Sequence, residues 1–397
     1  RHMTKMDSIF TREFYALNAL TFIAFSTVAI FFDYYQYLQS LPIDPQRFGI
    51  LIGVFSVSAL LLRPFLSLAI TIFNARKWIM ASGFVLIVVL MLYDLASSFW
   101  MVFIVRVVHG AAYVALATAI LTLLVGCIPQ EKSGQAFAFF SVVTLLPYAV
   151  IPPVIEPLAT LVGGFQRVLD LSGLLLILIF PLACLLNQDR IAADNHGQQQ
   201  LGLREIIGNI RNLRVATTLI LSFLVWTAFS PVFFFLQGFG KANGIDNPGL
   251  FFTLSTVAEI AVRVVAGTYL DRMDKSKLLG LSCAWLTVCY VFLAHVDDMP
   301  AAFLALGLCF GIGWGFAMPL LNGIIFDVSD YKFRSFNSNL GMQMSQMGFF
   351  VGPSLGGLIL VHSGYGLLYY ACGAMTMAAT VMALSFPRQQ ADSLTDK

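Results

Sequence analysis

The long apolar stretches of this sequence contain few ionisable side chains, and these are the groups that could do chemistry there. In chain order they are Asp33, Arg63, Arg106, His109, Glu156, Glu259 and Arg263. A charge at the centre of a membrane helix costs about 2.5–3.5 kcal/mol on insertion scales, so each is a candidate functional group. A carboxyl or imidazole group in such a place suits proton uptake and release, whereas a buried arginine stays charged. The alternative for each is a structural ion pair inside a helix bundle.

The composition indicates whether these groups lie in a soluble protein or in a membrane protein. Hydrophobic residues make up 58% of the 397 residues, charged residues 11%, and the mean hydropathy is +0.82. Soluble domains carry about a quarter charged residues, so we predict an integral membrane protein embedded in a lipid bilayer. A crossing needs about 20 apolar residues, so twelve helices and short loops nearly fill the length.

The apolar runs that would form these helices are separated by short polar breaks. They fall near residues 14–37, 48–73, 78–96, 100–128, 135–161, 168–186, 215–239, 250–270, 278–294, 301–326, 338–361 and 367–386. The longest break, 187–214, holds Gln198-Gln-Gln200 and a weakly amphipathic piece, 203–213, and we expect it to lie on the membrane surface. We therefore predict an N-terminal half at 4–187, a cytoplasmic linker at 188–214, a C-terminal half at 215–388 and a cytoplasmic tail at 389–397. Residues 1–3 are interpreted as an expression scar and the start, and no cleavable signal peptide is evident.

One charged turn between two apolar runs carries a recognisable pattern. It runs from Arg263 through Gly267, Asp271 and Arg272 to Lys275. This turn resembles the signature loop of the major facilitator superfamily, whose pattern is approximately G-x-x-x-D-R-x-G-R-K, with Asp274 here in place of the second glycine.

A diverged copy of the turn lies 200 positions earlier, where Arg63 matches Arg263. Ser67, Thr71 and Ile72 stand where Gly267, Asp271 and Arg272 do. A second pair of motifs has the same offset: Pro152-Pro153-Val-Ile-Glu156-Pro157 and Gly352-Pro353-Ser-Leu-Gly356-Gly357. Two motif pairs at one spacing indicate that the chain is a duplicated half.

The resemblance extends over the whole chain. The family's R-x-x-x-G element is similar to Arg106-Val-Val-His109-Gly110 here. The motif Arg63-Pro-Phe65 resembles that of bacterial drug or metabolite exporters. The resemblance implies an all-α membrane fold of twelve helices in two pseudo-symmetric six-helix halves. It also implies a secondary transporter that works as a monomer by alternating access.

Within that frame, the two lone carboxyls are candidates for proton coupling. Asp33 lies among aromatic residues in the first run, which lines the central cavity in the family, and it could also anchor a cationic substrate. Glu156 replaces a small residue of a motif that the family associates with antiporters. The run around Glu156 lacks the motif's glycines, which favours symport. Both residues could instead lie in water at the outer interface.

The other buried charges have roles that depend on their neighbours. Arg106 would tune a nearby carboxylate or hold an anionic substrate, and His109 would sense pH or simply complete the bundle. Glu259 precedes Arg263 by four residues and so can neutralise it on one helix face. The alternative is that Glu259 is left free to titrate.

Gating is assigned to Arg63, Arg263 and the signature turn. Asp271 at the membrane edge could latch a helix N-terminus of the other half, with Gly267 and Arg272 beside it. Thr71 and Ile72 cannot do this, so we predict an asymmetric inner gate in which Asp271→Asn impairs transport more than Thr71→Ala.

Further polar and small residues complete the candidates. The glycines of Gly311-x-Gly313-x-Gly315 are interpreted as close helix contacts, with a hinge at Pro319. Phe233-Phe-Phe235 could add an aromatic wall. The side chains expected to line the substrate cavity are Asn18, Tyr34, Gln36, Trp226, Gln237, Asn322, Gln343 and Gln346.

The lysines and arginines predict the orientation. With the N-terminus in the cytoplasm, seventeen of the 23 fall at cytoplasmic ends and loops and only Arg47, Arg167 and Lys241 fall outside. We therefore expect a multi-pass protein of the bacterial inner membrane with both termini cytoplasmic.

Function follows as a prediction with alternatives. No phosphate-binding loop, metal cluster or nucleophile arrangement occurs in the sequence, and the six cysteines lie in or beside apolar runs. We expect no enzyme, no cofactor, no metal and no nucleic acid partner. The leading interpretation is proton-coupled export of a small organic solute. The runner-up is proton symport for uptake of a nutrient such as an amino acid or organic acid, and a receptor or scaffold on the same fold is a third possibility.

Overall fold

The computed structural model describes residues 10–128, 133–187, 203–270, 273–296 and 299–386, and within these every regular element is helical. The α-helices are α1 (Arg12–Ala29), α2 (Tyr34–Gln39), α3 (Phe48–Ala69), α4 (Ala75–Leu92), α5 (Phe99–Cys127), α6 (Ser133–Val162), α7 (Phe165–Leu175), α8 (Ile179–Cys184), α10 (Leu203–Arg211), α11 (Leu213–Ala242), α12 (Leu250–Leu270), α13 (Lys275–Leu293), α14 (Pro300–Asp327) and α15 (Arg334–Leu384). Short 3-10 helices are η1 (Ile30–Asp33), η2 (Pro45–Arg47), η4 (Leu176–Leu178) and η5 (Tyr331–Phe333).

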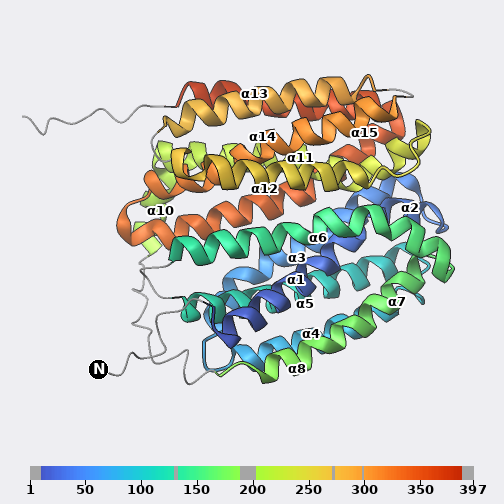
Figure 1. Cartoon of the computed structure of the whole chain (residues 1–397), viewed down its shortest axis with the longest axis horizontal. Helices are drawn as coiled ribbons and strands as arrows, with labels where there is room; N and C mark the ends of the chain where they lie inside the picture. The colour runs from blue at the N-terminus through green and yellow to red at the C-terminus, as the bar shows by residue number, and fades with distance from the viewer. Residues whose placement is uncertain (1–9, 129–132, 188–202, 271–272, 297–298, 387–397) are drawn as a thin grey trace, which may run out of the picture.

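The helices form two groups that lie side by side along their length (Figure 1). Helices α1 to α8, the N-terminal group, fill one side, and α10 to α15, the C-terminal group, fill the other. The groups meet mainly where α6 packs on α12 and where α3 packs on α15. The amphipathic piece expected between the halves is helical, as α10.

The apolar runs become membrane-length helices, as predicted. Ten segments in the described part of the chain are long and apolar enough to cross a membrane, so this is a multi-pass membrane protein. The last of them spans Phe336–Leu384, and its backbone leaves the helical conformation at Gly364, with φ of 78°. A glycine suits that position because L side chains rarely adopt positive φ.

Glycines let neighbouring helices approach to backbone contact in both groups. A side chain at Gly110 of α5 would collide with the Phe55 carbonyl of α3, and one at Gly311 of α14 would collide with the Ser255 carbonyl of α12. The two pairs differ in position by about 200 residues, which is the offset of the sequence motifs. The glycines of α14 therefore make close helix contacts, as the sequence predicted.

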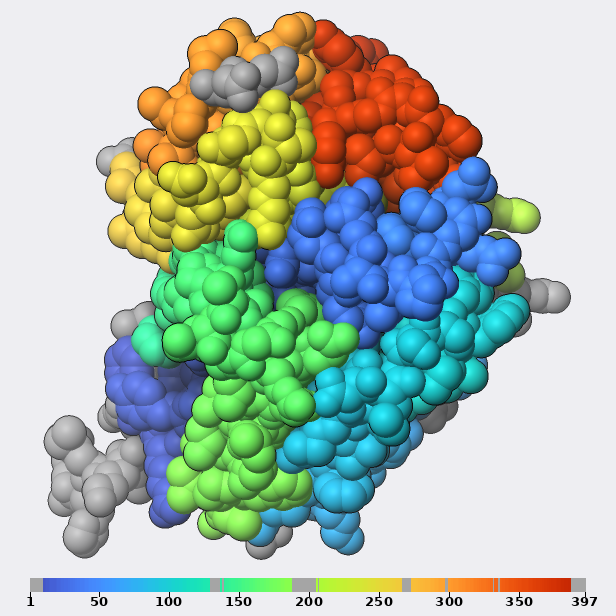
Figure 2. Space-filling view, turned by 90° about the vertical axis from the view of Figure 1, so that its right-hand side faces the viewer, coloured from blue at the N-terminus to red at the C-terminus, as the bar shows by residue number. Residues whose placement is uncertain are grey.

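The bundle is closed at one end and open at the other. In α3, the first half is packed on almost every side, whereas residues 61–69 are exposed on all faces apart from Arg63 and Leu66, which are half-buried. Helix α12 changes in the same way, from buried Phe251 and Phe252 to exposed Val264 and Val265. Figure 2 looks onto the closed end, where segments from the start of α3, the end of α6, the end of α11 and the middle of α15 meet.

Candidate functional site

The two helix groups are joined at the closed end by a charged contact. The Glu156 carboxylate of α6 accepts a hydrogen bond from Gln237 Nε2 of α11 at 2.6 Å. Its other oxygen lies 2.9 Å from Lys241 Nζ, one turn further along α11. Gln237 and Lys241 lie on one face of α11 because they are four residues apart, so one carboxylate engages both. Glu156 is half-buried and Lys241 is exposed, so the pair is only partly shielded from water.

Asp33 lies beside this contact, at the end of η1. Its side chain is buried, with 7% of its surface exposed, and its Oδ1 has no hydrogen-bond partner in the described part of the chain. The charges that act on Asp33 are those of Lys241 and Glu156. We call Asp33, Glu156, Gln237 and Lys241 the closed-end cluster. It brings together two carboxyl candidates that lie 123 positions apart in the sequence.

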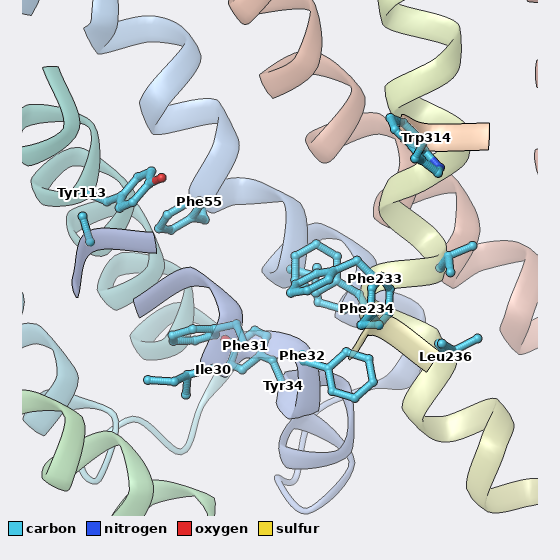
Figure 3. Close-up of a cluster of buried hydrophobic side chains, with 14 of the residues drawn as sticks. Ile30, Phe31, Phe32, Tyr34, Phe55, Tyr113, Phe233, Phe234, Leu236 and Trp314 are labelled. Carbon is cyan, nitrogen blue, oxygen red and sulfur yellow. The ribbon is translucent and has the colours of Figure 1, made fainter. Parts of the chain in front are cut away.

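Aromatic rings around Asp33 fasten η1 to both helix groups. Phe32 packs against Phe233 of α11, with ring centroids 5.9 Å apart (Figure 3). Phe31 and Tyr34 turn the other way, into the N-terminal group, where both rings cover the Arg106 guanidinium at 4.6 Å. Asp33 therefore lies between aromatic residues that pack against both helix groups.

Arg106 itself is enclosed and engages backbone. Its Nε donates to the Leu51 carbonyl at 3.2 Å and its Nη2 to the Ile52 carbonyl at 2.8 Å. Only 2% of the residue is exposed, and it makes no ion pair with a carboxylate of the described residues. In this conformation Arg106 therefore does not face a cavity or pair with a described carboxylate, contrary to the expectation. The guanidinium instead ties α5 to α3 through backbone carbonyls and cation–π contacts.

His109 is part of the same interior. Its Nδ1 lies 3.1 Å from the Tyr93 hydroxyl, and its ring packs between Phe31 and Phe55. The residue is fully buried, and its Nε2 has no partner among the described residues. This is the environment of a bundle histidine rather than of a pH sensor in contact with water.

The arginine pair of the duplicated motif lies further from the closed end. Arg263 Nη2 donates to Glu259, one turn earlier on α12, so the intrahelical neutralisation predicted from the spacing is confirmed. Arg263 Nη1 also donates to Ser141 Oγ of α6, across the groups. Arg63 reaches the other way, with its Nη1 3.1 Å from Met342 Sδ of α15.

The polar residues expected to line one cavity are spread over several places. Gln237 belongs to the closed-end cluster, and the Gln36 side chain lies near Gly238 beside it. Asn18 is buried and donates to the Phe14 carbonyl of its own helix, and Tyr34 is fully buried on Arg106. These last two are packing residues in this conformation, contrary to the expectation.

The remaining candidates lie on the C-terminal group. Trp226 is half-buried in a cluster of rings with Phe229, Trp314 and Phe349, at centroid distances of 5.3 to 5.6 Å from its own ring. Gln343 of α15 is buried with its Oε1 unpaired in the described structure. Gln346 is half-buried and Asn322 exposed. The aromatic wall expected from 233–235 is buried instead, whereas Trp226, Phe229 and Phe349 of this cluster are half-buried.

The signature turn gives no further test. Asp271 and Arg272 lie outside the described residues, and the surroundings of Gly267 are not described either. The proposed latch therefore stays a prediction. Two contributors were not anticipated, namely Lys241, which was counted only as an outer charge, and Ser141. The spacing of Gln237 and Lys241 could have revealed the first, since it places two donors on one helix face.

Comparison with known proteins identifies the family. The model of the major facilitator superfamily matches residues 14–346 and, in a second match, 249–397. The chain belongs to the major facilitator superfamily. It is accordingly a transporter of small molecules and not an enzyme.

Three members with known names share 13–20% sequence identity with this chain. The staphylopine export protein of Staphylococcus aureus is 20% identical over 349 residues, which cover 84% of this chain and 86% of that protein. The crystal structure of the nucleoside transporter NupG matches with a TM-score of 0.74 at 15% identity, covering 95% of this chain and 98% of that one. The human organic anion transporter MFSD10 matches with a TM-score of 0.63 at 13% identity, covering 94% and 99%. At these identities, the two structures support the fold alone.

Proposed function

We propose that this protein exports a small organic solute in exchange for protons, by alternating access between two six-helix halves. The twelve crossings would be the ten apolar segments with Phe336–Leu384 divided at Gly364, together with α12, whose 21 residues are also membrane-length. The halves would be residues 4–187 and 215–388, joined by the linker that contains α10. Alternating access needs one end closed while the other is open, and the contrast between the two ends of α3 supports this arrangement.

The closed end is proposed to face outward in a bacterial inner membrane. The chain at this end carries Arg47, Arg167 and Lys241, whereas most of the lysines and arginines that the structure describes lie at the opposite end. The conformation would then be inward-facing, and the termini and α10 would lie in the cytoplasm. A solute would enter from the cytoplasm between the exposed second halves of α3 and α12.

The observation that carries the proton coupling is the burial of Asp33 at the closed end, where no cation of the described residues pairs with it alone. Glu156 and Lys241 offset each other's charge. A charged Asp33 would be buried with one oxygen unpaired, which is strongly unfavourable, whereas a protonated carboxyl is neutral. Protonation of Asp33 from the outside would therefore favour closure of this end. Loss of that proton would favour reopening, so each cycle would couple proton movement to a change of access.

Export is favoured by the relative named as an export protein. Proton symport for nutrient uptake is the second candidate. It is favoured by the sequence of α6, which lacks the glycines of the antiporter motif. This helix instead contains Pro147, Pro152, Pro153 and Pro157. Asp33 would couple protons to transport in either direction.

The test is proton flux in proteoliposomes with an acidic lumen, challenged with lipophilic cations, amino acids and organic acids. We expect added solute to trigger proton efflux and the Asp33→Asn variant to lose this flux while it still binds solute. Asp170→Asn is the matched control, since Asp170 belongs to an exposed pair with Arg167 near the same end. Proton movement with the solute would support uptake instead. Unchanged coupling in Asp33→Asn would exclude Asp33 as the proton carrier.

A further inference from the structure

Two arginines at equivalent positions of the duplicated chain reach across the contact between the helix groups. Arg63 extends from α3 to Met342 of α15, and Arg263 extends from α12 to Ser141 of α6. The partners, like the arginines, are about 200 positions apart. The sequence thus places one guanidinium in each of two related contacts.

Among the described residues, Arg263 has a counter-charge and Arg63 has none. Arg263 pairs with Glu259, four residues before it, whereas the position four residues before Arg63 is Ala59. The only bond of Arg63 in the described structure is to the Met342 thioether, which is a weak acceptor. Its Nε has no partner there. Arg63 is therefore a largely unsatisfied cation in a membrane-spanning segment.

The position of Arg63 makes it reachable from the open end. It is half-buried at the point where α3 changes from packed to exposed, with Leu61, Leu62 and Phe65 all exposed around it. The phenol of Tyr113, on α5, lies close enough to interact with it electrostatically. That hydroxyl makes no hydrogen bond to the described part of the chain, so a guanidinium and a phenol are both available as donors.

We propose that Arg63 binds an anionic group of the transported solute, a carboxylate or phosphate, and that the substrates are small organic anions. An oxyanion can accept two parallel hydrogen bonds from a guanidinium, which a thioether cannot, so it would displace Met342. Arg106 cannot fill this role, because its donors are taken by carbonyls and rings cover it. Since Met342 belongs to α15, anion binding would also replace a contact between the groups with one to the solute.

This inference rests on the proposed function only in assuming that a solute enters from the open end. It is independent of transport direction and of proton coupling. Binding in detergent, without a proton gradient, therefore tests it separately. If anion binding depends on Arg63 but no proton flux is found, this proposal holds and the claim of proton coupling fails. If proton flux is found but anion binding does not depend on Arg63, this proposal fails and the claim of proton coupling holds.

The experiment measures binding of matched probes to the purified full chain by thermal shift and titration. The probes are 2-naphthoate, 2-naphthyl phosphate and the neutral 2-naphthamide. We expect the two anions to bind at least ten-fold more tightly than the amide, and Arg63→Gln to abolish that preference. Arg63→Lys should restore part of it, because the charge returns without the planar fork. Arg47→Gln, which removes a surface arginine stacked on Phe99, should leave the preference unchanged.

A second pair of variants keeps the test decisive if Arg63→Gln does not fold. Met342→Glu would supply the missing carboxylate in a side chain that is 44% exposed, and Met342→Gln is its uncharged match. We expect Met342→Glu to lose anion binding and Met342→Gln to retain it. Equal binding of the anions and the amide by the wild-type protein, no binding of either anion, or undiminished anion binding in Arg63→Gln or Met342→Glu would overturn the proposal.

Discussion

The two contacts between the helix groups share a close approach of backbone at a glycine but differ in the side chains around it. Where α3 meets α15, backbone touches backbone: a side chain at Gly49 would collide with the Pro353 carbonyl, and one at Gly53 would stand 2.7 Å from the Phe350 carbonyl. Where α6 meets α11 and α12, a side chain at Gly249 would likewise collide with the Pro152 carbonyl, but here polar side chains add to the contact. Besides the closed-end cluster, Asn247 Nδ2 donates to the Pro153 carbonyl at 2.9 Å and Thr253 Oγ1 to the Ala149 carbonyl at 2.6 Å.

Because of this difference, the two contacts of the closed end should respond to different changes, one to side-chain volume alone and the other also to charge. Close packing of glycines depends on side-chain volume and is indifferent to protonation. A contact made of carboxylate, amide and ammonium groups depends on charge and salt. Both contacts at the closed end therefore depend on glycine packing, and the α6 contact also contains charged groups that protons can influence. The three variants below separate these sensitivities, in order of decreasing effect.

The largest effect is expected from filling the glycine contact. Gly49→Ala should destabilise the closed conformation by about 3 kcal/mol, because the new Cβ meets backbone that cannot rotate away. Gly366→Ala is the matched control, since nothing lies within 4 Å of a Cβ at that position. The readout is labelling of a Gln36→Cys reporter by an external, membrane-impermeant maleimide, in a background free of the six native cysteines. Equal labelling in the two alanine variants would show that the close approach is not what holds this contact.

An intermediate effect is expected from the charged contact. Glu156→Gln removes the charge that attracts Lys241 while keeping an acceptor for Gln237. Because the pair is half-exposed and so partly screened, we expect a loss of about 1 kcal/mol in the closed conformation, or about a five-fold rise in reporter labelling. High salt should produce the same change in the wild-type protein and none in Glu156→Gln. A salt response that persists in the variant would place the sensitive charge elsewhere.

The smallest effect is expected from single neutral hydrogen bonds. Thr253→Val keeps the side-chain shape but removes the donor to the Ala149 carbonyl. This should lower the free energy of unfolding by about 0.5–1.5 kcal/mol, and by the lower value if water partly reaches this half-buried site. Thr160→Val is the control, since Thr160 bonds only within its own helix, to the Glu156 carbonyl. The thermal midpoint in detergent should fall for Thr253→Val more than for Thr160→Val. An equal fall would mean that the bond between the groups adds nothing beyond a local one.

The sequence predicted the helices, the glycine contacts and the Glu259–Arg263 pair, because each follows from local spacing or composition. Asp33 and Glu156 were recognisable as candidates because a carboxyl in an apolar run is costly. Their meeting with Lys241 was not predictable, since it depends on how the ends of α6, η1 and α11 are positioned by packing between the groups. The same reason explains why Arg106 was misjudged: its depth in α5 was correct, but the carbonyls and rings around it come from α3 and η1.

The central claim is that closure of one end goes together with protonation of Asp33. The most direct test is the distance between spin labels at Gln39→Cys and Ala242→Cys, two exposed positions on either side of the closed end, measured by pulsed electron resonance in lipid. Closure that requires a protonated carboxyl is most stable at low pH and is lost as pH rises. The account predicts that the wild-type distance lengthens as pH is raised from about 5 to about 8, and that Asp33→Asn stays short throughout while Asp170→Asn behaves as wild type. A pH response that survives in Asp33→Asn would contradict it.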